Sequence, residues 1–214
     1  MTELEWLTCA DPKAMIQWHY RSMKTRKQRL FDIHYDRHLL LLGTVADLHP
    51  RIFKDWERYA EGIASIEDLV LKPSSLFTEG FDFYPGELWE HERPETFVRE
   101  YGWLSDLLRD IVGNPFRPVV YDPNWLTTDV VAIARGMYES RDFSPMPLLA
   151  DALQDAGCEN EDILNHCRSA RDFSPFSLMG NIIQDAQEDV LNHSRFAGPH
   201  VRGCWVVDLI LGKN

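Results

Sequence analysis

The chain has 214 residues, of which 44% are hydrophobic and 26% charged, and its formal net charge is −12. A chain of this length and composition can bury a core of its own, so intrinsic disorder is not expected. The acidic balance argues against general nucleic-acid binding, because neutralising phosphates requires an excess of Lys and Arg on one face.

The sequence also argues against a membrane protein. Its longest uninterrupted apolar runs, residues 39–42 and 209–211, are far shorter than the roughly 20 residues that span a bilayer. The opening residues 1–6 are acidic and do not resemble a secretory leader. Four scattered cysteines are too few for a disulfide framework. We therefore expect a cytoplasmic protein.

Cap residues and prolines at first helical positions predict a run of short helices in the N-terminal half. These helix starts lie at Pro12, Thr25, Pro50 and Ser65. Apolar residues at spacings of three and four follow each start, and the second helix is expected to continue to Gly43.

Residues 72–95 interrupt this helical pattern with prolines and glycines, yet they are rich in aromatic side chains. A long loop of this kind is expected to be ordered over the core or to carry a function, and it is a candidate sub-boundary. Aromatic residues are enriched in binding hot spots, and the alternative is that these rings cap the core. The candidate binding residues are Phe81, Phe83, Tyr84 and Trp89.

Helices are predicted again at residues 96–111 and 128–138, and a local duplication follows. The motif Arg-Asp-Phe-Ser-Pro occurs twice, so residues 141–170 and 171–197 are two copies of a helix pair. About three repeats are normally needed for an independent solenoid, so this pair extends an existing helical domain. The final segment, residues 201–211, is predicted to be a buried helix, with a buried strand as the alternative.

Together these elements predict an all-α fold in a single domain covering residues 1–214. The arrangement is expected to be a multi-helix bundle or an irregular α-solenoid-like array with a long ordered aromatic loop.

Several segments spread along most of the chain resemble segments of other proteins. They are residues 5–12, 26–31, 114–118, 125–127, 149–153 with 156–158, 162–168 and 198–208, the last reading Gly-Pro-His-Val-Arg-Gly-Cys-Trp-Val-Val-Asp. In these segments the chain resembles a paralogous protein family of planctomycete bacteria. This resemblance does not imply any activity for the chain. It implies that residues 169–197 are an insertion by duplication, and the chain departs from the family at residues 32–38, where similar proteins are rich in cysteine.

One group of cysteine and histidine residues is a candidate zinc site, because zinc prefers four Cys and His ligands. Its members are Cys158, His166, Cys167, His200 and Cys204. His200 and Cys204 would lie one turn apart on a helix, but the spacings match no standard zinc motif. The alternative is that Cys167 and Cys204 are small buried hydrophobic residues and that His166 binds carbonyls at a helix end.

Two further groups could bind a ligand. His34 and His38 lie one helical turn apart and could hold a metal, although burial at a helix-packing face fits them better. A basic patch is a candidate anion site, with pairing to acidic residues of the same chain as the preferred alternative. The patch consists of Arg21, Lys24, Arg26, Lys27 and Arg29.

The sequence contains no Gly-rich phosphate loop, nucleophile elbow or HExxH motif, so it does not support an enzyme. The first hypothesis is a non-catalytic helical protein that interacts with a protein partner or has a regulatory role. The alternatives are a zinc-stabilised helical protein and an enzyme of unknown type. No cofactor is indicated apart from zinc.

Overall fold

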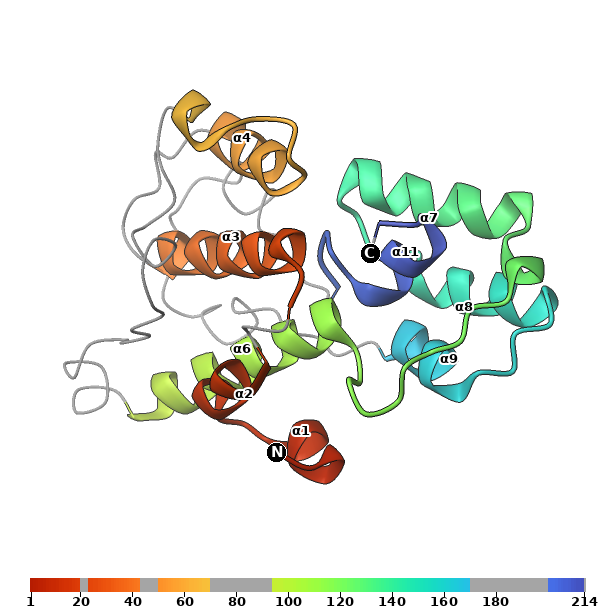
Figure 1. The fold of residues 1–214 in the computed structure, drawn as a ribbon, viewed down its shortest axis with the longest axis horizontal. Helices are drawn as coiled ribbons and strands as arrows, with labels where there is room; N and C mark the ends of the chain where they lie inside the picture. Colours follow the sequence, from red (N-terminus) through yellow and green to blue (C-terminus); the bar gives the residue numbers. More distant parts are fainter. Residues whose placement is uncertain (20–22, 43–49, 70–93, 170–199, 214) are drawn as a thin grey trace, which may run out of the picture. The chain divides into compact units, whose positions relative to one another are not determined.

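The computed structural model describes residues 1–19, 23–42, 50–69, 94–169 and 200–213. Within these ranges all regular elements are helical, which confirms the all-α prediction (Figure 1). No helix in the described ranges is long and apolar enough to cross a membrane. The loop at residues 72–95 lies largely outside the described residues, as does the second copy of the duplication.

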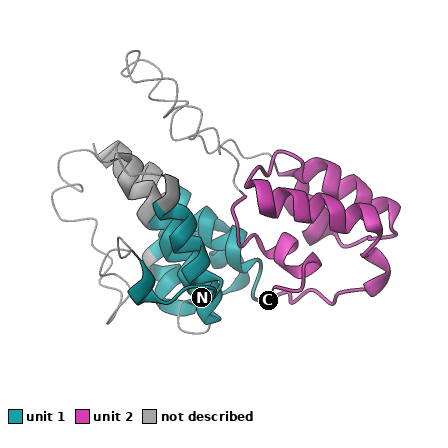
Figure 2. Ribbon diagram, turned by 90° about the horizontal axis from the view of Figure 1, so that it is seen from above, with its two compact units in different colours: residues 1–116 teal, residues 117–214 magenta. Residues whose placement is uncertain are grey.

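The chain divides into two compact units, which Figure 2 distinguishes by colour. Unit 1 comprises Met1–Phe116 and unit 2 comprises Arg117–Asn214. The division falls within the connection Asn-Pro-Phe-Arg-Pro that follows Gly113, where the chain makes a turn at Pro115 and Phe116, and not in the loop at residues 72–95. Proline disfavours helical backbone in the residue before it, and Asn114 and Arg117, which each precede a proline, lie outside the helices.

Unit 1 contains five α-helices and one 3-10 turn among its described residues. These are α1 (Glu3–Thr8), α2 (Pro12–His19), α3 (Thr25–Leu42), α4 (Pro50–Ala60), the turn η2 (Ile66–Asp68) and α6 (Pro94–Val112). Three of the predicted starts, Pro12, Thr25 and Pro50, are confirmed. Ser65 opens a single 3-10 turn where a short helix was expected.

The core of unit 1 is formed where α3 packs on α4, and α6 packs on α2 and α3. Leu30 and Ile33 of α3 meet Trp56 and Ala60 of α4, and all four side chains are buried. These residues recur at spacings of three and four, so each helix presents one apolar stripe to the other.

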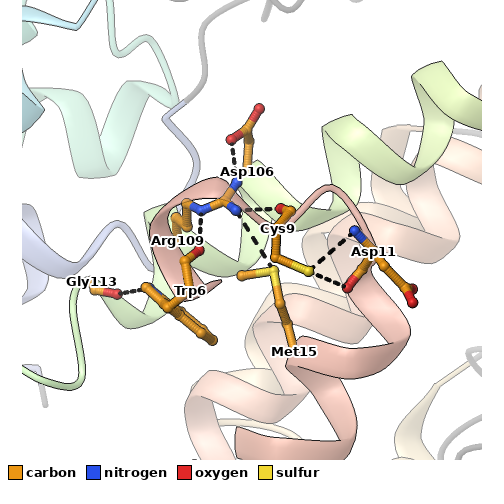
Figure 3. Close-up of polar contacts among 7 residues, drawn as sticks. All are labelled: Trp6, Cys9, Asp11, Met15, Asp106, Arg109 and Gly113. Carbon is orange, nitrogen blue, oxygen red and sulfur yellow. Dashed lines mark hydrogen bonds and ion pairs between the residues drawn. The ribbon is translucent and has the colours of Figure 1, made fainter. Parts of the chain in front are cut away.

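The N-terminal helix α1 is bound to the end of α6 by reciprocal hydrogen bonds (Figure 3). Arg109, in the last turn of α6, donates from Nε to the carbonyl oxygen of Trp6 at 2.9 Å and from Nη2 to that of Cys9. In return the buried indole of Trp6 donates from Nε1 to the carbonyl oxygen of Gly113 at 3.0 Å. Carbonyls at the end of a helix lack intrahelical partners, so each helix supplies donors to the other.

Unit 2 is built from short helices around one hydrophobic cluster. Its described elements are the 3-10 turn η4 (Pro123–Trp125) and the helices α7 (Thr128–Ser140), α8 (Met146–Asp155), α9 (Glu161–Arg168) and α11 (Trp205–Ile210). Helices α8 and α9 are the helix pair predicted within residues 141–170, and the N-cap of α9, Asn160, accepts a hydrogen bond from the backbone N–H of Ile163 at 3.1 Å.

The last helix is shorter than predicted. It was expected over residues 201–211, but α11 begins at Trp205. Gly203 has φ of +107°, a conformation that a helix cannot include, so the chain makes a turn before the helix starts. The alternative of a buried strand in this segment is wrong, because α11 is helical.

Candidate metal centre

Three of the five predicted zinc ligands come together in unit 2. The ligand atoms of His166, His200 and Cys204 lie within 4.8 Å of one another. Nε2 of His166 is 3.2 Å from Sγ of Cys204, and Nδ1 of His200 is 3.9 Å from the same sulfur. The two imidazole rings meet edge to face, with centroids 4.7 Å apart. The sulfur therefore lies beside both imidazoles.

Two segments far apart in the sequence supply these side chains. His166 belongs to the last turn of α9, where Ser169 donates from its backbone N–H and its hydroxyl to the carbonyl oxygens at the helix end. Ser169 thus satisfies the carbonyl oxygens at the end of α9, which were the alternative partners expected for His166. The His166 ring lies against Cys204 instead.

His200 and Cys204 are brought together by a turn and not by a helix as predicted. The backbone N–H of Cys204 donates to the carbonyl oxygen of Val201 at 2.8 Å, and Gly203 takes the positive φ of the turn. Cys204 then caps α11, and its carbonyl oxygen accepts the N–H of Asp208 at 2.9 Å. The turn and the first turn of α11 thus fix the thiol beside the imidazoles.

The donor set and its spacing fit a tetrahedral metal. With Zn–S of about 2.3 Å and Zn–N of about 2.0–2.1 Å, two ligands at a tetrahedral angle are about 3.6 Å apart. The sulfur–nitrogen distances of 3.2 and 3.9 Å lie on either side of that value. Cys204 and His200 are buried and His166 is half-buried. The arrangement could hold a metal ion with three protein ligands.

The other two predicted ligands lie, like Cys204, in the hydrophobic cluster of unit 2. Cys158 and Cys167 are each 1% exposed and belong to the same cluster as the apolar side chains of α7, α8 and α9. Burial raises the pKa of the Cys158 thiol, which favours the neutral form over the thiolate that metals bind. Neither residue belongs to the group of ligand atoms around Cys204.

Tyr138 of α7 contacts both flanks of the terminal segment, and sequence analysis did not identify it. The guanidinium carbon of Arg202 is 4.1 Å from the centroid of its ring, and the Lys213 ammonium is 4.6 Å from it. Such cation–π contacts stabilise by about 0.5–1 kcal/mol at exposed sites and more when desolvated. The sequence contains no motif that would pair these residues, because the contact depends on how α11 packs on α7.

Described members of the basic patch make internal contacts in unit 1. Arg26 forms a two-bond ion pair with Glu61, with N–O distances of 2.9 and 3.1 Å. Lys27 donates to the carbonyl oxygen of Ile111, while Arg29 donates to the carbonyl oxygen of Tyr59 at 3.2 Å and lies 4.4 Å from that ring's centroid. These contacts favour internal pairing over an anion site. Lys24 is exposed, and Arg21 lies outside the described residues.

The remaining candidates fall wholly or partly outside the described part of the chain. Phe81, Phe83, Tyr84 and Trp89 all belong to residues 70–93, so their role in binding a partner stays a prediction. His34 is buried in α3, whereas the side chain of His38 is outside the described part.

The chain was compared with protein-family models, curated proteins and solved structures, and none of them matches it. Its functional assignment therefore depends on its own residues.

Proposed function

We propose that the protein is a zinc-binding helical protein in which His166, His200 and Cys204 hold the metal. The main support for this proposal is that two imidazole nitrogens and one thiol sulfur from separate segments lie within 4.8 Å of one another. Imidazole and thiolate are the donors that zinc takes in proteins, whereas magnesium and calcium take oxygen.

The role of the ion in this proposal is to bind the terminal segment to α9. His166 precedes the metal site's other two ligands by more than thirty residues, so one ion closes a long loop of chain. Metal binding to such a set contributes directly to folding stability, because the unfolded chain has no preformed site.

The competing explanation is a hydrogen-bonded Cys–His cluster that binds no metal. The 3.2 Å distance between Nε2 of His166 and Sγ of Cys204 is also suitable for a hydrogen bond involving sulfur. The two explanations differ in one respect: a hydrogen-bonded cluster binds no metal ion, whereas a ligand set binds zinc through the thiolate of Cys204.

The test is titration of metal-free protein with Co²⁺, followed by competition with Zn²⁺. Thiolate coordination gives Co²⁺ a sulfur-to-metal charge-transfer band, which zinc should then abolish. We expect the band in the native chain and in Cys158→Ser, and not in Cys204→Ser. An unchanged band in Cys204→Ser, or no band in the native chain, would refute the proposal.

A further inference from the structure

The imidazole ring of His166 meets two other rings beside the candidate metal centre. Its centroid is 5.1 Å from that of the Trp205 ring, with the ring planes tilted by 53°, and 4.7 Å from that of His200. Its Nε2 is 3.2 Å from the Cys204 sulfur. The His166 ring thus contacts a tryptophan while its Nε2 faces the sulfur.

Trp205 is held in place by the core of unit 2. It is the first residue of α11, directly after Cys204, and its side chain is partly buried against the hydrophobic cluster. Val206 and Val207, the next two residues of the helix, are at most 1% exposed in the same cluster. Helix α11 also packs on α9, the helix that carries His166. This packing sets the indole against the last turn of α9.

His166 needs a fixing contact more than the other two ligands do. Cys204 and His200 are buried, whereas His166 is half-buried at the end of α9. The side-chain torsions of a histidine take several staggered values, and only some of them bring Nε2 to the Cys204 sulfur. A side chain that is already held in the binding conformation loses less conformational entropy when a metal binds.

We propose that Trp205 is a positioning residue of the zinc site and acts through His166. Packing of the indole on the imidazole selects the conformation in which Nε2 faces the Cys204 sulfur, so the ligands are arranged before the ion binds. Cys204 then supplies one ligand, and the residue next to it orients another ligand from a different helix. This inference rests on the proposed zinc site and adds to it a residue that acts without binding the metal.

The test compares Co²⁺ affinity in full-length native chain, Trp205→Leu, Trp205→Phe and Trp125→Leu. Leucine keeps apolar character at residue 205 but removes the ring, whereas phenylalanine keeps a ring. A contact between two aromatic rings changes an equilibrium constant by a factor of about 2 to 12, so Trp205→Leu should weaken Co²⁺ binding about 2- to 12-fold. Trp205→Phe should restore most of the native affinity.

Trp125→Leu is the matched control. Trp125 is also partly buried against the hydrophobic cluster of unit 2, but its ring meets that of Tyr121, at a centroid distance of 6.4 Å. Urea denaturation of the metal-free chains measures how far each substitution destabilises the fold. A destabilised chain that is still folded keeps its affinity, because apparent affinity depends on the fraction of competent molecules. Trp125→Leu should therefore lower the free energy of unfolding and leave Co²⁺ affinity unchanged.

A second ringless variant covers the case in which Trp205→Leu does not fold. Trp205→Met fills more of the space that the indole leaves, and the same loss of affinity is expected from it. If neither variant folds without metal, Trp205 is a core residue and the inference is overturned.

The affinities and the sulfur-to-metal charge-transfer band give the remaining outcomes. Native affinity in Trp205→Leu, or an equal loss in Trp125→Leu or Trp205→Phe, shows that the ring contact does not position a ligand. Loss of the band from Trp205→Leu at saturating Co²⁺ shows that the indole acts through Cys204, which contradicts a role through His166. A native chain without the band refutes the proposed function as well, whereas a native band with an affinity independent of residue 205 refutes this inference alone.

Discussion

Substitution of Arg109 tests how α1 is held in unit 1. In Arg109→Met the side chain keeps its length and its apolar stem but loses the hydrogen bonds to the carbonyl oxygens of Trp6 and Cys9, together with an ion pair to Asp106 within α6. Hydrogen bonds to a charged group contribute about 1.5–3 kcal/mol each. The Arg109 side chain is 20% exposed, so water can replace part of the lost hydrogen bonding. We therefore expect the free energy of unfolding to fall by about 2–4 kcal/mol.

The assay is urea denaturation followed by tryptophan fluorescence, which is sensitive to the buried rings of Trp6 and Trp56. The midpoint should fall without a change in the slope, since stability changes but the surface exposed on unfolding does not. Limited proteolysis should cut within or next to α1 faster than in the native chain.

Arg58→Met is the matched control. Arg58 forms an ion pair with Asp55 at 3.6 Å, and the two side chains are 58% and 37% exposed. Exposed ion pairs of this kind contribute at most about 1 kcal/mol and often nothing measurable. If Arg109→Met lowers the free energy of unfolding no more than Arg58→Met does, the assignment of α1 docking to Arg109 is wrong.

Three further substitutions give independent predictions. Ser105→Ala should stabilise unit 1 by up to about 1–3 kcal/mol in urea denaturation, because the fully buried Ser105 hydroxyl makes no hydrogen bond with any residue that the structure describes; destabilisation would contradict this. Gly203→Ala should weaken Co²⁺ binding about 5- to 30-fold, because a positive φ costs an L-residue about 1–2 kcal/mol, and unchanged affinity would exclude the turn as the positioning element. Replacing Phe83 and Trp89 with Ser should abolish recovery of a protein partner without lowering the melting temperature if the rings form a binding face; a lower melting temperature would instead identify them as core residues.

The N-terminal half shows which parts of the fold can be read from local sequence. Pro12, Thr25 and Pro50 mark helix starts because a proline or a cap residue acts within one turn, and the structure places helices at each of them. The helix α1 was not predicted, although Thr2 and Glu5 form the capping box Thr-x-x-Glu that begins it. That signal was present in the sequence and could have identified the helix.

The metal centre shows which parts cannot be read in this way. Zinc chemistry selects Cys and His, so the sequence indicated five candidates, but it could not say which of them meet. The choice depends on the positive φ of Gly203, which brings His200 and Cys204 to one side of a turn, and on the packing of α11 against α9, which brings Cys204 to His166. Both are consequences of tertiary structure and not of spacing.

Metal analysis of the purified full-length chain tests the central claim most directly. Elemental analysis after exhaustive dialysis should find about one zinc ion per native chain, the same content in Cys158→Ser, and none in Cys204→Ser. Absence of stoichiometric zinc from the native chain, or its retention in Cys204→Ser, would contradict the claim that His166, His200 and Cys204 form a zinc site.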